Sequence, residues 1–278
     1  WHRRETKAMK FEAPQFDEQL NPNIPHEHPL KEWWRMCAWL VGLAVVVWLA
    51  LGAMTWVLPR WISIEQERTW LGDLAAPWVH EARSDAKLQA LADQLAQHMA
   101  LPQGSVRVYI AQNEMVNAFA TFGGNVVLMQ GLLNELPSEE AVAAVLAHEM
   151  GHIKHRDPLR SMSRSMVLGV LSAAIFGSDS SLQQISQLET LRYSRDLEEA
   201  ADAAALHALA AHYRHVGGMV QTLQILDKVD KTHPHLAWVN THPHPQQRLT
   251  AIQDLAQQHQ YTFQPPVLPN QWRAALPN

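Results

Sequence analysis

The chain has 278 residues, 47% of them hydrophobic, and a formal net charge of -5 at neutral pH. Acidic and basic residues are interspersed, so nothing in the composition indicates nucleic acid as a partner. The hydrophobic content is ample for the core of one compact domain, and the lone Cys37 gives no disulfide evidence for either an oxidising or a reducing compartment.

A long apolar segment follows a polar amino-terminal tail at residues 1–32. The 23 residues from Met36 to Leu58 carry no charge, which at about 1.5 Å per residue is enough to cross a hydrocarbon core of roughly 30 Å. A core helix of this length would show a polar stripe, and a cleavable signal would not follow such a tail. We therefore expect residues 33–60 to form one transmembrane helix in the lipid bilayer, anchored by tryptophans at both ends: Trp33, Trp34, Trp56 and Trp61.

The orientation of this helix depends on the basic residues beside it. Lys31 and Arg35 flank its start, and Arg60 and Arg68 flank its end, so the nearest charges are balanced. Basic residues farther back in the tail favour a cytoplasmic tail and an exported domain after the span: Arg3, Arg4, Lys7 and Lys10.

Beyond the span we expect a linker at residues 61–83 and one domain at residues 84–261. The domain begins with an amphipathic helix from Ser84 to Met99, ended by Pro102. Residues 105–110 alternate apolar and polar side chains like a half-buried strand, and residues 125–129 form a second apolar run. The pattern predicts an α+β, mainly α domain with a small antiparallel sheet.

Residues 148–152 read His-Glu-Met-Gly-His. A helix that starts with Ser138 as its N-cap would carry this motif into the interior, because the residues between are small or apolar. On that helix His148 and His152 lie one turn apart on the same face, so they can take two corners of a tetrahedral zinc site. Glu149 then lies beside the metal, where a general base can take a proton from the attacking water. The alternative is a pair of surface histidines on an ordinary helix.

A hydrolytic zinc site needs a third protein ligand and one open position. The segment from Leu182 to Leu209 has no glycine or proline, so we expect one long helix there. On it Glu198 and Asp202 share a face, so Glu198 can ligate the metal while Asp202 accepts an N–H from a ligand histidine. Alternatively, both acids belong to a solvated face, as charges on helices usually do.

Further short motifs lie before and after these residues: Asn117-Ala118-Phe119-Ala120, Gly123-Gly124, Gly131-Leu132-Leu133, Ser194-Arg195, and Thr241-His242-Pro243 with Arg248. Together with the histidine motif they resemble the membrane-associated gluzincin family of HtpX, BepA and the CAAX prenyl proteases, over roughly residues 78–258. The amino-terminal third shows neither a secretory signal nor the several spans of HtpX or the prenyl proteases. Single-span or peripheral members are therefore the better comparison.

The resemblance implies a zincin-like endopeptidase with one Zn²⁺ per chain, held by His148, His152 and Glu198, and with Glu149 as catalytic base. It also implies that an edge strand binds extended peptides by backbone pairing, which places substrate at Asn117, Ala118, Phe119, Gly123, Gly124 and Asn125. The resemblance does not fix the substrate. We expect unfolded or membrane-associated proteins, and the basic residues of the tail favour the periplasmic side of a bacterial inner membrane.

The same resemblance draws attention to the histidine- and proline-rich loop at residues 233–245, because in relatives this loop lies over the active-site cleft. A neutral imidazole at His242 would fill the open position of zinc and block the site reversibly, and Arg248 would stabilise the oxyanion of peptide hydrolysis. The alternative is an exposed loop without a role.

Two other segments and two rival functions remain. The apolar residues between Met162 and Phe176 are too few to span a membrane, so we expect core packing there, and residues 262–278 read as an irregular, proline-rich tail.

The rival functions are a membrane-tethered chaperone or adaptor and a protein with a purely structural metal. A free carboxylate at Glu149 argues against both, because a structural zinc site is closed. The oligomeric state does not follow from the sequence.

Overall fold

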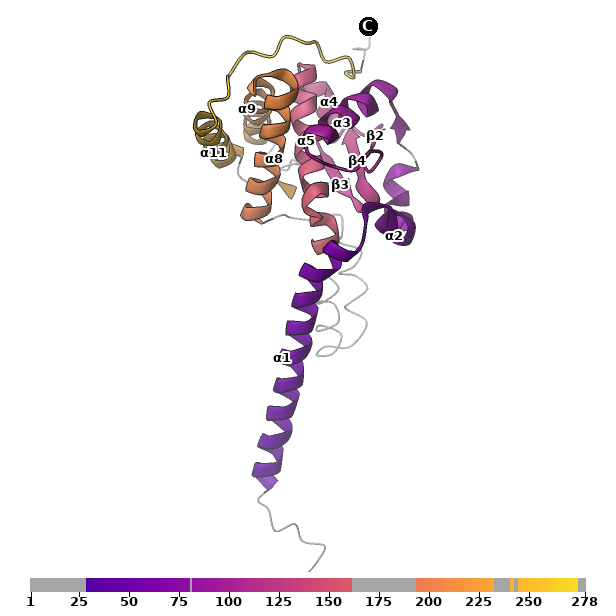
Figure 1. Cartoon of the computed structure of the whole chain (residues 1–278), viewed down its shortest axis with the longest axis vertical. Helices are drawn as coiled ribbons and strands as arrows, with labels where there is room; N and C mark the ends of the chain where they lie inside the picture. The colour runs from indigo at the N-terminus through magenta and orange to yellow at the C-terminus, as the bar shows by residue number, and fades with distance from the viewer. Residues whose placement is uncertain (1–28, 81, 162–193, 233–240, 243–244, 275–278) are drawn as a thin grey trace, which may run out of the picture. The chain divides into compact units, whose positions relative to one another are not determined.

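The structure is a computed structural model that describes residues 29–80, 82–161, 194–232, 241–242 and 245–274 (Figure 1). The polar tail up to residue 28, the apolar segment from Met162 onward and most of the histidine-rich loop lie outside the described residues. The chain divides into two compact units, Trp1–Ala50 and Leu51–Asn278, which are described separately below.

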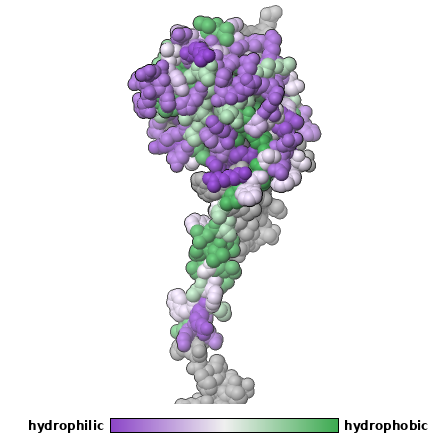
Figure 2. All heavy atoms as spheres, viewed as in Figure 1, coloured by the Kyte–Doolittle hydropathy of each residue, from purple (hydrophilic) through white to green (hydrophobic). Residues whose placement is uncertain are grey.

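Helix α1, Pro29–Trp61, contains the expected apolar segment. Its stretch Leu30–Ala50 is long and apolar enough to cross a membrane, judged by length and composition. Bulky side chains such as Trp39 and Trp48 are exposed along it, and Figure 2 shows a mostly hydrophobic surface on this helix. Side chains of this kind need an apolar environment, so the helix fits the predicted span.

Helix α2, Ile64–Val79, occupies most of the expected linker at residues 61–83. A capping box starts this helix: the Gln66 N–H donates to Ser63 Oγ over 3.1 Å, and the Ser63 N–H donates to Gln66 Oε1 over 2.8 Å. The helix packs against the sheet at the 3₁₀ turn η2, Phe122–Gly124. This tertiary contact, which lies far away in sequence, is why local patterns did not indicate a helix here.

The sheet has four strands in the order β1-β2-β4-β3: β1 Arg83–Ser84, β2 Arg107–Ala111, β3 Ala118–Thr121 and β4 Asn125–Met129. Both predicted strands are present. The sheet is mixed rather than antiparallel, because β2 and β4 run parallel, with Arg107 opposite Asn125. The hairpin partner β3 occupies the other side of β4, which leaves β3 at the edge of the sheet among the described residues.

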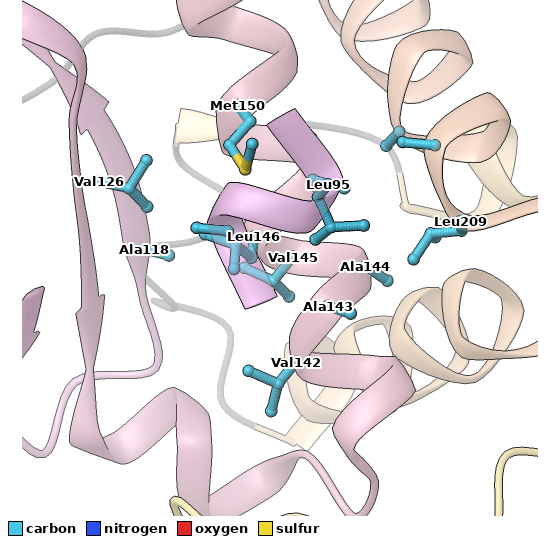
Figure 3. Close-up of a cluster of buried hydrophobic side chains, with 14 of the residues drawn as sticks. Leu95, Ala118, Val126, Val142, Ala143, Ala144, Val145, Leu146, Met150 and Leu209 are labelled. Atoms are coloured by element: carbon cyan, nitrogen blue, oxygen red, sulfur yellow. The ribbon is translucent and has the colours of Figure 1, made fainter. Parts of the chain in front are cut away.

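The core lies between this sheet and helix α5, Glu139–His155, which is buried along nearly all its length. Figure 3 shows Leu146 and Met150 of α5 among Ala118 and Val126 of the sheet and Leu95 of α3. Helix α3, Ala86–His98, confirms the predicted amphipathic helix, with Leu88, Leu91 and Leu95 buried. The short helix α4, Gln130–Glu135, joins β4 to α5.

The described residues of the domain also include three longer helices after α5: α8 Arg195–Tyr213, α9 Gly217–Thr232 and α11 Pro245–Gln258. Of the predicted helix from Leu182 to Leu209, residues 182–193 lie outside the described residues, and α8 starts at Arg195 after an extended Ser194. Gly151 of α5 faces the backbone of Ala201 on α8 so closely that an added Cβ would lie 2.8 Å from Ala201 Cα. The two helices that carry the predicted ligands therefore cross in close contact.

The carboxy-terminal segment is irregular, as expected, but it packs onto the domain rather than extending from it. Trp272 is 4% exposed, and its Nε1–H donates to Asp85 Oδ1 at the start of α3 over 3.1 Å. Glu140 in the first turn of α5 accepts hydrogen bonds from the N–H groups of Val267 and Leu268. A single buried tryptophan surrounded by prolines gives no periodic pattern, so the sequence did not predict this contact.

Candidate active site

Helix α5 positions the histidine motif. Ser138 caps its start, as predicted, by accepting the N–H of Ala141 over 3.1 Å. The helix remains regular to His155, so His148 and His152 project from one face, and both are fully buried. The buried position excludes the alternative of surface histidines.

Four side chains from three parts of the chain converge at this face: His148 and His152 of α5, Glu198 of α8, and His242 just before α11. Nε2 of His148 lies 3.2 Å from both His152 Nε2 and His242 Nδ1. The oxygens of Glu198 lie 2.9 Å from His242 Nδ1, 3.4 Å from His148 Nε2 and 3.5 Å from His152 Nε2. Glu198 is therefore not on a solvated face.

These distances fit a tetrahedral metal site. With zinc–nitrogen bonds of about 2.0–2.1 Å, the edges of a coordination tetrahedron are about 3.3–3.4 Å. The separations between the side-chain donor atoms, 2.9–3.5 Å, bracket that value. Two imidazole nitrogens that face each other at 3.2 Å also need a cation or a proton between them, because neutral acceptors do not bond to each other. The donor set of imidazoles and one carboxylate suits Zn²⁺.

Glu149 lies next to this cluster and is completely buried. Within the described residues, neither of its carboxylate oxygens accepts a hydrogen bond; Oε1 lies 3.4 Å from His242 Nε2. A buried carboxylate without hydrogen-bond donors is costly to a fold. Its position beside the ligand atoms rather than among them is the one predicted for a general base.

Asp202 orients His148, as predicted, with Oδ1 2.8 Å from Nδ1 of the imidazole. Arg248 holds the opposite side of that carboxylate in a bidentate pair, with Nε and Nη2 at 2.8 and 2.7 Å, and its Nη1 lies 3.0 Å from Glu198 Oε2. All three nitrogens of the guanidinium therefore face carboxylates. This arrangement favours a role for Arg248 in holding Asp202 and Glu198 in place over the predicted role at the oxyanion.

A second carboxylate, which the sequence did not predict, orients the other histidine of the motif. Asp157 is fully buried, and its Oδ2 lies 2.9 Å from Nδ1 of His152. Each motif histidine thus has its own carboxylate behind it, the usual arrangement for fixing which nitrogen faces a metal. Asp157 is the second residue after the end of α5, and Arg156 between them has the left-handed conformation.

The carboxylates give the site a strongly negative field. Burial alone would lower the pKa of His152, but its hydrogen bonds to Asp157 and Glu198 raise that pKa to about 9. Burial alone would raise the pKa of Asp202, yet the charges of Arg248 and His148 lower it to about 2. Burial alone would also raise the pKa of Glu198, but the charge of His242 and hydrogen bonds with the three histidines hold that pKa far below its ordinary range. A pocket that stabilises protons on imidazole in this way also attracts a metal cation.

The predicted substrate residues separate into two groups. Asn117, Ala118 and Phe119 lie at the start of the edge strand β3, the strand that packs against α5. Gly123, Gly124 and Asn125 are buried at the turn against α2, where an added Cβ on Gly123 would meet the Arg68 backbone at 2.7 Å. The second group therefore also packs the turn closely, and contact with substrate stays a prediction for both groups.

Comparison with known proteins places these residues in a family. The model described as Peptidase family M48 matches residues 82–256, more than half of the chain. The beta-barrel assembly-enhancing protease of Escherichia coli K12 is 26% identical over 200 residues, which cover 66% of this chain and 41% of that protein. The corresponding protease of Yersinia pestis is 31% identical over 125 residues, covering 42% and 26% respectively. A Protease HtpX homolog of Persephonella marina is 38% identical over 102 residues, covering 35% and 31%. The chain thus spans less than half the length of these relatives.

Proposed function

This chain belongs to peptidase family M48, a family of metallopeptidases, and we propose that it is a membrane-anchored, zinc-dependent endopeptidase. The observation that carries the proposal is the set of ligand-atom separations among His148, His152, Glu198 and His242, with the uncommitted carboxylate of Glu149 beside them. A structural zinc site is closed by its protein ligands and does not require a free carboxylate beside it.

His148, His152 and Glu198 would hold one zinc ion per chain. When bound there, zinc supplies Lewis-acid chemistry, which lowers the pKa of water and polarises the carbonyl of a peptide. The protein's own contribution is to present three donors that are already in place, because Asp202 and Asp157 fix the two imidazoles and Arg248 fixes Glu198.

Glu149 is the proposed general base. Its carboxylate receives the proton of the attacking water and returns it to the amine of the leaving peptide, so the same side chain serves both halves of the reaction. No neighbouring donor among the described residues holds its oxygens in another hydrogen bond, which leaves both available for this proton transfer.

His242 is the proposed gate of the site. It is 1% exposed and lies within the ligand cluster, 3.2 Å from His148 and 2.9 Å from Glu198. Four protein donors close a tetrahedral site, whereas hydrolysis needs one open position. We propose that the site is blocked while His242 is in place and opens when the loop before α11 withdraws it.

The proposed substrates are unfolded or membrane-associated proteins of a bacterial inner membrane, cleaved on its periplasmic side. The names of the relatives support a protease, and α1 supports membrane association. An extended segment of substrate would pair with edge strand β3 at Asn117–Phe119, because backbone pairing accepts many sequences. This mode of binding suits a protease that acts on unfolded chains.

The test is cleavage of an unfolded, fluorescently labelled casein by the detergent-solubilised chain and by Glu149→Gln. We expect cleavage by the wild type and a loss of at least 100-fold in the variant, with the zinc content retained. Equal cleavage by both proteins would reject Glu149 as the base. Binding of casein by wild type without any cleavage, with zinc bound, would favour the chaperone or adaptor function.

A further inference from the structure

The end of α5 is held in place by a residue from another helix. Arg156 follows α5 in the left-handed conformation, with φ of 61°. Its Nη2 lies 2.7 Å from Glu67 Oε2 and donates to the carbonyl of Ile62 over 2.7 Å. This backbone conformation is unfavourable for a residue with a Cβ, so the side-chain contacts of Arg156 help to maintain it.

The carboxylate of Glu67 on α2 makes a second contact in addition to the one with Arg156. It is 4% exposed, and its Oε1 accepts the N–H of Gly123 over 3.1 Å. Gly123 belongs to the turn between β3 and β4. One buried carboxylate therefore connects the end of the motif helix with the turn that follows the edge strand.

The residue that follows Arg156 connects this contact to the metal site. Asp157 is fully buried and orients the imidazole of His152 through a 2.9 Å contact. The position of its carboxylate depends on the backbone of Arg156, because Arg156 is the single residue between Asp157 and the end of α5. A release of Arg156 would let this turn relax and would move Asp157 away from His152.

We propose that Glu67 is a positioning residue for the metal site, which acts on His152 through Arg156 and Asp157. The inference rests on the proposed function, since it presumes that His152 binds zinc. It goes beyond that function because Glu67 lies outside residues 82–256, the part that the family model matches. The helix directly after the apolar span then contributes to the geometry of the site.

The experiment measures the affinity of the detergent-solubilised full chain for Zn²⁺, by competition with a chelator, in Glu67→Gln and in the wild type. We expect about 10-fold weaker binding, the lower end of the effect of removing a partner that orients a ligand directly. Glu65→Gln is the matched control, because Glu65 is an exposed glutamate on the same helix. Its zinc affinity should equal that of the wild type.

A double variant tests the path. In an Asp157→Asn background, the additional change Glu67→Gln should have no further effect on zinc affinity, because the connection is already lost. A general loosening of the fold would instead give additive losses, which would overturn the proposal. If Glu67→Gln does not fold, Arg156→Gln replaces it: glutamine keeps the Cβ that disfavours the left-handed backbone but lacks the guanidinium that holds it, and it should give the same 10-fold loss.

Two further outcomes separate this inference from the proposed function. A wild-type chain that binds no zinc rejects the proposed function, and the inference with it. A wild type that binds zinc, together with Glu67→Gln that binds it equally well, rejects only the role of Glu67.

Discussion

Gly151 offers a test of how the helix crossing sets the metal site. In Gly151→Ala the new Cβ would lie 2.8 Å from both Cα and O of Ala201, whereas ordinary contact begins at 3.4 Å. The helices α5 and α8 must therefore separate by about 0.6 Å, since the obstacle is backbone. Overpacking of this kind costs about 1–3 kcal/mol, and the better helix propensity of alanine offsets about 1 kcal/mol of it.

The net effect on the free energy of unfolding is thus small, about 0–2 kcal/mol of destabilisation. The effect on the metal site is larger, because α5 carries His148 and His152 while α8 carries Glu198. We expect the affinity for Zn²⁺ to fall by at least 10-fold. Thermal unfolding and chelator competition on the solubilised chain measure both quantities.

Gly72→Ala is the control for this prediction, because Gly72 also lies within a helix, yet an added Cβ would meet nothing within 4 Å. That variant should gain slightly in stability and keep its zinc affinity. A Gly151→Ala protein with wild-type zinc affinity would refute the reasoning, since the close crossing would then have no bearing on the site.

Four further substitutions test contacts at the site and in the carboxy-terminal segment. Asp202→Ala should weaken zinc binding by about 10- to 100-fold while the domain stays folded; an unchanged affinity would remove its orienting role. His242→Ala should retain zinc and raise basal cleavage of casein, and Arg248→Ala should lower turnover; unchanged basal cleavage in the first variant would reject the gate. Trp272→Ala should destabilise the domain by about 3–5 kcal/mol, measured by denaturant unfolding, and a loss below about 1 kcal/mol would show that the tail contact is dispensable.

Much of the site could be predicted from the sequence because its elements are local. The N-cap Ser138, the pair His148 and His152, and the pair Glu198 and Asp202 each follow from spacing on one helix. That they converge in space could not be derived from periodicity, and only the resemblance to a family connected them with His242 and Arg248.

The missed features all depend on contacts between distant segments. The parallel pairing of β2 and β4 skips over the hairpin strand β3, so neighbouring strands in the sequence are not neighbours in the sheet. Asp157 reaches His152 only through a left-handed residue that is not a glycine, which sequence rules do not predict. Helix α2 gives a weak local signal, and the burial of Glu67 depends on Arg156, which is distant in sequence.

Metal content tests the central claim most directly. Elemental analysis of the purified full chain should find one zinc ion per chain, because the ligand atoms of His148, His152, Glu198 and His242 lie within 4.8 Å of one another and form a single site. The double variant His148→Ala with His152→Ala should contain none, since it keeps only two of those donors. Stoichiometric zinc in that double variant would contradict the account, because the metal would then be bound somewhere else.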